Sequence, residues 1–162
     1  MEFFHLSDNL KRRINFLLEC AKHEGTKDQV VTYALRVLSN HATIGRDAPS
    51  STIKKLNKNI SNKAFVLLSM NKFDLFSEQT VNEHPKPLLS TWNWLKENST
   101  TLSVGDVWSH FLENPMVTIT KLEDAKIRKS GQNHTGDMET RYLQLGISIK
   151  VLQETPLMLF KN

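Results

Sequence analysis

The feature that most constrains the fold is a repeat of apolar residues near the start of the chain. Their spacing places all of them on one face only if the segment is a helix. The repeat consists of Leu10, Ile14, Leu17, Leu18 and Ala21. Spacings of four, seven, eight and eleven residues fall on one helical face, so a helix is expected here with that face buried. Ser7 can cap its first turn, and the negative charge of Asp8 suits the positive end of the helix dipole.

A second apolar segment follows after a short connection. Thr26 and Gln29 have the spacing of a capping box, and apolar residues continue to about His41. A short loop between two amphipathic helices makes them antiparallel neighbours, so residues 8–42 predict a helical hairpin. Turn-forming residues then predict a loop over 43–50.

The remainder, 51–162, predicts helices mixed with short strands. Its predicted helices cover 52–59, 87–98, 104–113, 121–129 and 137–145, and its predicted strands cover 116–120, 147–151 and 157–160. The apolar run 64–68 fits a helix or a strand. The expected fold class is α+β in a single domain, 1–162, with a helix-rich N-terminal half and a small antiparallel or mixed sheet in the C-terminal half.

Composition excludes several classes of protein. With 39% hydrophobic residues and a net charge of +4, the chain is too apolar to stay disordered. No run of about 18 apolar residues exists, so no membrane span is expected, and the first residues lack the apolar core of a secretory signal. The single cysteine, Cys20, excludes an intramolecular disulfide and any multi-cysteine metal site. We therefore expect a cytoplasmic protein without metal or cofactor.

Basic residues are concentrated in two segments. No acid occurs between Asp47 and Asp74, and the lysines of that stretch proposed to contact nucleic acid are Lys54, Lys55, Lys58 and Lys63. Lys126, Arg128 and Lys129 precede a glycine-containing polar loop, where they suit phosphate or minor-groove contact. The alternatives are a solvated lysine surface in the first segment and, in the second, cations that complement the end of a short helix.

Arg36 and His41 are candidate catalytic residues. They form an R-x4-H motif in a predicted helix, which resembles the HEPN-type ribonucleases in these two residues. The resemblance implies that the imidazole activates the ribose 2′-hydroxyl and the arginine stabilises the phosphorane charge, without a metal. Five residues turn a helix by about 500°, which leaves the side chains roughly 140° apart. Both reach one site only if the helix distorts or ends, or if two subunits pair as a homodimer; otherwise Arg36 is solvated and His41 complements the helix dipole.

Three further residues are weaker candidates. His84 beside Glu83 suits a general base near neutral pH, whereas a loop histidine bonded to backbone is the simpler interpretation. Trp94 is predicted on the polar side of its helix, where an indole could anchor a protein partner or stack on a base. Packing against the helix at 104–113 is the alternative.

Common nucleotide-binding and hydrolase signatures are absent, including the Walker A, Rossmann, G-x-S-x-G and H-E-x-x-H motifs.

Three short segments are similar to an uncharacterised family of bacteria and phages that has no established activity. They are Asn82–Glu83–His84–Pro85, Thr120–Lys121–Leu122–Glu123–Asp124 and Arg141–Tyr142 with Gly146–Ile147. The resemblance implies a biological setting and no mechanism.

The leading hypothesis is a non-enzymatic bacterial or phage protein that binds DNA or RNA through its basic segments. A metal-independent ribonuclease using Arg36 and His41 is the second hypothesis. The third is an inhibitor or antitoxin that binds a host protein, with Trp94 in the contact.

Overall fold

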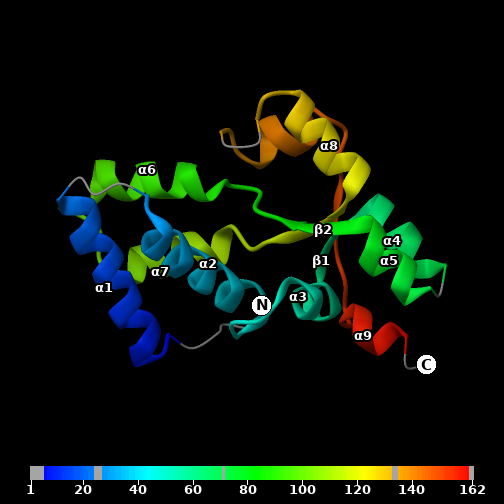
Figure 1. Cartoon of the computed structure of the whole chain (residues 1–162), viewed down its shortest axis with the longest axis horizontal. Helices are drawn as coiled ribbons and strands as arrows, with labels where there is room; N and C mark the ends of the chain where they lie inside the picture. Colours follow the sequence, from blue (N-terminus) through cyan, green and yellow to red (C-terminus); the bar gives the residue numbers. More distant parts are fainter. Residues whose placement is uncertain (1–5, 24–26, 71, 133–134, 161–162) are drawn as a thin grey trace.

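A computed structural model describes residues 6–23, 27–70, 72–132 and 135–160, and it has the α+β architecture expected from the sequence. Figure 1 shows the elements, which in chain order are α1 (Asp8–Lys22), α2 (Gln29–Ile44), α3 (Ser50–Leu56), β1 (Asn59–Ser61), α4 (Asn62–Ser69), α5 (Phe73–Gln79), β2 (Thr80–Glu83), α6 (Leu88–Asn98), α7 (Val104–Glu113), β3 (Val117–Thr120), α8 (Lys121–Lys129), a π-helix η1 (Glu139–Leu143), β4 (Ile149–Val151) and α9 (Pro156–Leu159). No helix in these described ranges is long and apolar enough to cross a membrane.

The helical hairpin forms as predicted, with one correction at the start of its second helix. The Ser7 hydroxyl caps α1, and the five apolar residues of the repeat are all buried. The predicted Thr26–Gln29 capping box is wrong, because the Asp28 carboxylate accepts from Val31 N and makes Gln29 the first helical residue. Thr26 itself lies outside the described residues. The helix also runs beyond His41 to Ile44, so the loop predicted over 43–50 is shorter than expected.

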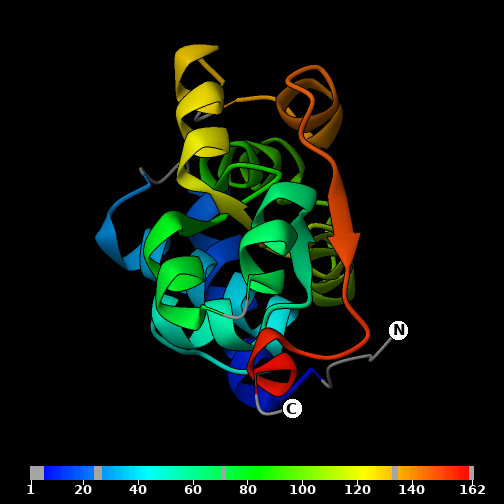
Figure 2. The same ribbon diagram turned by 90° about the vertical axis from the view of Figure 1, so that its right-hand side faces the viewer.

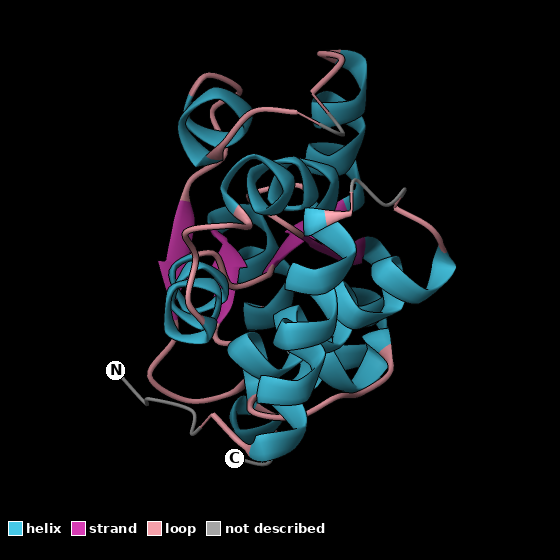
Figure 3. Cartoon of the chain, turned by 90° about the vertical axis from the view of Figure 1, so that its left-hand side faces the viewer, coloured by secondary structure: helices cyan, strands magenta, loops and turns pink. Residues whose placement is uncertain are grey.

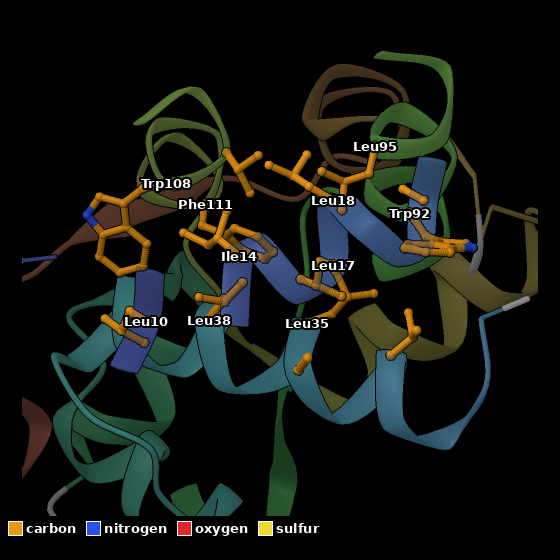
Figure 4. Packing of buried hydrophobic residues seen from close by; sticks show 14 of the residues in the cluster. Leu10, Ile14, Leu17, Leu18, Leu35, Leu38, Trp92, Leu95, Trp108 and Phe111 are labelled. Atoms are coloured by element: carbon orange, nitrogen blue, oxygen red, sulfur yellow. The ribbon is translucent and has the colours of Figure 1, made fainter. Parts of the chain in front are cut away.

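The hairpin is half of a four-helix lobe in which α1, α2, α6 and α7 pack together. Figure 4 shows the apolar side chains that fill the space between these helices. The largest are Trp92 of α6 and Trp108 of α7, which are 1% and 6% exposed. Burial of each such side chain contributes about 1.5–3 kcal/mol, so this core is the main source of stability of the lobe.

The second part of the molecule is built on a four-stranded mixed sheet with the strand order β2-β3-β1-β4. β1 pairs with β3 in parallel, and the other two pairings are antiparallel. The polar strands β1 and β2 and the helix α5 were not predicted from the sequence. The strand predicted at 157–160 is wrong, since that segment is the short helix α9. The apolar run 64–68 belongs to α4, with only Ala64 and Leu68 buried.

The two faces of the sheet are covered by different helices. One face carries Val81, Val117 and Ile119, which pack with α8, η1 and the residues that follow them. On the other face, Ile60 packs with buried side chains of α4 and α5. Figure 2 shows α8 on one side of the strands and α4 and α5 on the other, and Figure 3 shows the four-helix lobe in front of the sheet. Helix α8 is therefore an outer element with a single supporting surface.

Candidate nucleic-acid interface

One side of α8 is fixed firmly to the sheet. The predicted capping box is present: Thr120 Oγ1 accepts from Glu123 N, and Glu123 Oε2 accepts from Thr120 N. Glu123 is 2% exposed, and its Oε2 also accepts a 2.6 Å hydrogen bond from the Ser61 hydroxyl of β1. Ile127, one turn later, is buried against the strands. These contacts orient α8 and turn its remaining residues outward.

The outward side of α8 is cationic. Lys121, Lys126 and Lys129 are exposed, and within the described residues no carboxylate lies within 4.0 Å of their ammonium groups. Arg128 donates from Nε to Asp124 Oδ2 at 2.9 Å, yet its side chain stays 70% exposed. Because Glu123 is buried and Asp124 pairs with Arg128, the charges that α8 offers to solvent without an ion pair are those of Lys121, Lys126 and Lys129. Lys121 was absent from the residues proposed for this segment, although it stands directly after the predicted cap.

The lysines of the first basic segment are used differently. Lys54 is half-buried and donates from Nζ to the Ser77 carbonyl oxygen at 2.6 Å. The ammonium of Lys55 lies 5.6 Å from the centre of the Phe73 ring, a cation–π contact with α5. Lys58 is half-buried, and Lys63 is exposed at the start of α4. Lys54 and Lys55, proposed from the sequence as phosphate-binding residues, therefore interact with other parts of the protein.

The charge of α8 acts on the first basic segment. Burial lowers the pKa of the Lys54 ammonium, and the charge of Lys121 lowers that pKa further. The field of Lys121 therefore reaches Lys54.

Arg36 and His41 are not brought together by α2, which continues without interruption to Ile44. Arg36 is exposed, and its charge acts on His84. Burial lowers the pKa of His41, while Asp47 and the Gly45 backbone raise it. The two residues of the R-x4-H motif therefore have different neighbours.

Glu83 lies in the most extensive buried polar network of the described structure. Arg141 is 1% exposed and grips both carboxylate oxygens of Glu83 through its Nη atoms. The same guanidinium donates to the carbonyl oxygens of His84 and Pro85, and its Nε donates to the Gln132 carbonyl oxygen at 2.7 Å. The Tyr142 hydroxyl donates to Glu83 as well. Burial raises the pKa of Glu83, and Arg141 and Tyr142 oppose that rise.

This network fastens the segment after α8 to the connection between β2 and α6. Gly136 shows how closely the segment is packed: its φ is 85°, and a Cβ there would lie 2.5 Å from Thr140 Oγ1 and 3.0 Å from Arg141 Cγ. Arg141 and Glu83 are 58 residues apart, so sequence spacing gave no sign of the pair. The only signal was their presence in two of the three family-like segments. With its charges paired and enclosed, the network acts as a structural clamp.

The imidazole of His84 forms no hydrogen bond to this clamp through Nε2. Its Nε2 is enclosed and has no hydrogen-bond partner among the described residues. Burial lowers the pKa of His84 to about 4, and the charges of Arg36 and Arg141 act in the same direction. The imidazole is therefore neutral at pH 7, which is the form of a general base, but its enclosed Nε2 offers a substrate no direct approach.

Trp94 is half-buried and packs within the four-helix lobe. Its ring is stacked on His110 of α7, with 4.1 Å between ring centres and 11° between planes. Burial lowers the pKa of His110 to about 4, so this is a contact between two neutral rings at pH 7. Packing against α7, the alternative to partner binding, accounts for the position of the indole.

The described residues contain no group of three or more His, Cys, Asp or Glu side chains placed to bind a metal ion. No known protein family, curated protein or solved structure matches the chain. The exposed cations of α8 are therefore the feature of the described structure that bears most directly on function.

Proposed function

We propose that this protein binds nucleic acid without catalysis, through the phosphate backbone, and that α8 is the main contact surface. The observation that supports the proposal is the set of exposed cations on α8, namely Lys121, Lys126, Arg128 and Lys129. Lysine and arginine side chains that contact phosphates release condensed counterions, and this release drives sequence-independent binding. The ammonium groups of Lys121, Lys126 and Lys129 are available for that role because they form no ion pair with the described residues.

The first basic segment has a secondary role in this proposal. Lys63 and Lys58 add positive charge, whereas Lys54 and Lys55 mainly hold α5. The charge of Lys121 lowers the pKa of Lys54, so the field of α8 reaches this segment. We propose that the protein acts in the cytoplasm of a bacterium or of an infected cell. The single cysteine and the three family-like segments agree with this location.

The test is the binding of labelled double-stranded DNA and single-stranded RNA, measured by fluorescence anisotropy at about 50 and about 200 mM salt. In one variant, Gln replaces all four cations of α8. In the matched control, Gln replaces four cations of the other lobe, namely Lys11, Arg12, Lys22 and Lys96. Both variants lose the same net charge, so only a localised contact distinguishes them.

We expect salt-sensitive binding of the unmodified protein that the α8 variant loses and the control keeps in large part. Binding that ignores salt, or equal losses in the two variants, would overturn the proposal. Running the RNA on a gel afterwards tests the catalytic alternative. If the unmodified protein shortens the RNA and the His41→Ala variant leaves it intact, the protein is a ribonuclease instead. Absence of any nucleic-acid binding would leave the protein-binding hypothesis.

A further inference from the structure

We infer that α8 enters the major groove of B-form DNA, so that duplex DNA is the ligand class of this surface; the inference rests on the proposed function. The first observation is one of shape. Helix α8 has nine residues and packs on β2 and β3, and Figures 1 and 2 show it at the edge of the molecule. Nine residues span about 13 Å, and a helix of about 10–12 Å diameter fits a major groove about 12 Å wide.

The second observation is the order of side chains along the exposed side. Ala125, Lys126 and Lys129 lie three, four and seven residues after Leu122, which places the four residues in one stripe. Leu122 is 77% exposed, and its methyl groups suit contact with the C5-methyl group of thymine. The small Ala125 lets the helix backbone approach the base edges.

The cations have two positions relative to this stripe. Lys126 and Lys129 lie within it, where an ammonium can donate to N7 and O6 of guanine. Lys121 and Arg128 lie about 100° to one side of it around the helix, where they face a phosphate strand when the stripe faces the groove floor. The helix thus has base-edge donors in its centre and phosphate contacts at its border.

The positions of the aromatic residues favour a duplex over a single-stranded ligand. Proteins that bind single strands stack bases on exposed aromatic rings. Among the described residues from 121 to 143, Tyr142 is the one Phe, Trp or Tyr, and it is 0% exposed and bonded to Glu83 in the clamp. The large exposed aromatics of the described chain, Phe16 and Tyr33, lie on α1 and α2 in the other lobe. The described part of the α8 surface therefore offers charge and a helical shape, and no stacking platform.

Groove dimensions separate DNA from double-stranded RNA. The major groove of an A-form helix is deep and too narrow for protein side chains to read, whereas that of B-form DNA admits a helix. Helix α8 is also rigid before binding, since its capping box, the Ser61–Glu123 bond and buried Ile127 hold it in one orientation. A preorganised helix loses little conformational entropy when it docks.

The test uses a steric block that leaves every charge in place. Ala125→Trp adds a large side chain at an exposed position in the middle of the stripe, and Ser109→Trp does the same on the exposed side of α7. Thermal unfolding checks that both variants are folded. Affinity is then measured for duplex DNA, for duplex RNA of the same sequence, and for duplex DNA with bulky C5 substituents on its cytosines.

We expect Ala125→Trp to weaken duplex DNA binding on the order of tenfold or more, and Ser109→Trp to leave it unchanged. Duplex RNA and the C5-substituted DNA should both bind the unmodified protein more weakly than plain duplex DNA. Undiminished binding by Ala125→Trp, or equal affinity for the three duplexes, overturns groove insertion. If the α8 charge variant still loses binding in that case, phosphate contact by α8 stands; if it binds normally, both proposals fall.

Discussion

The two basic segments of the chain have similar compositions and different structural roles. In the first segment, Lys54 is bonded to the Ser77 carbonyl and Lys55 lies over the Phe73 ring. In α8, the ammonium groups of Lys126 and Lys129 face solvent. The comparison shows that a count of charges along the sequence does not measure the charge available to a ligand. The packing of the helix that carries the charges decides this.

The difference follows from where the two helices lie. Helix α3 packs against β2, α2 and α9, so its lysines extend over neighbouring elements. Helix α8 rests on one face of the sheet through Glu123 and Ile127, and its other residues apart from half-buried Asp124 are exposed. Arg141 is the extreme case of an internally used cation, because it is buried and bonded to Glu83 and to backbone carbonyls. Cations of the two kinds should respond differently to substitution, and the predictions below depend on that difference.

The largest effect is expected from removal of the buried cation. Arg141→Met leaves the Glu83 carboxylate buried without its partner, so we expect a loss of about 3–5 kcal/mol in the free energy of unfolding, measured by urea denaturation. Arg128→Met is the matched control, since its ion pair with Asp124 is exposed and contributes at most about 1 kcal/mol. Equal losses in the two variants would contradict the division between internal and external cations.

The next effect concerns His84, whose pKa is lowered by burial and by the charges of Arg36 and Arg141. The pKa of His84 falls to about 4 in the folded protein, so the unfolded chain takes up a proton first as the pH decreases. Stability should therefore decline from about pH 6.5 to about pH 4, by up to about 3 kcal/mol for a depression of this size. His84→Gln should flatten the part of the decline due to this residue. His23→Gln, at an exposed position, should not; a profile unchanged by His84→Gln would refute the assignment.

A smaller effect should separate two lysines of the same segment. Lys54→Met removes the hydrogen bond from Lys54 Nζ to the Ser77 carbonyl oxygen, and both residues are half-buried. We therefore expect a loss of about 1 kcal/mol in the free energy of unfolding. Lys63→Met changes an exposed side chain and should stay within about 0.5 kcal/mol of the unmodified protein. Thermal or urea unfolding of the pair gives the answer. A greater loss for Lys63→Met would mean that the two lysines have been assigned the wrong roles.

Elements with local signals were predictable from the sequence. Helices α7 and α8 have the predicted bounds because Ser103 and Thr120 form capping boxes, which need only residues three positions away. Strand β1 consists of Asn59, Ile60 and Ser61 and has no such signal. It exists because β3 and β4 pair with it from more than 50 and 80 residues away.

The candidate site follows the same rule. The cations of the predicted helix 121–129 were visible in the sequence, and their exposure follows from the apolar and buried positions of that helix. The bond of Lys54 to Ser77 and the clamp between Arg141 and Glu83 join residues 23 and 58 positions apart. Long-range contacts of this kind depend on tertiary packing, which local spacing does not encode.

The most direct measurement compares the salt dependence of duplex DNA binding for two variants of four substitutions each. One replaces Lys121, Lys126, Arg128 and Lys129 with Gln, and the other replaces Lys54, Lys55, Lys58 and Lys63 with Gln. The slope of log affinity against log salt is negative, and its magnitude should decrease by about 0.9 for each phosphate contact removed. We predict a clear decrease in this magnitude for the α8 variant and a much smaller one for the other. Equal slopes, or a greater decrease for the first segment, would contradict the claim that α8 is the nucleic-acid-binding surface.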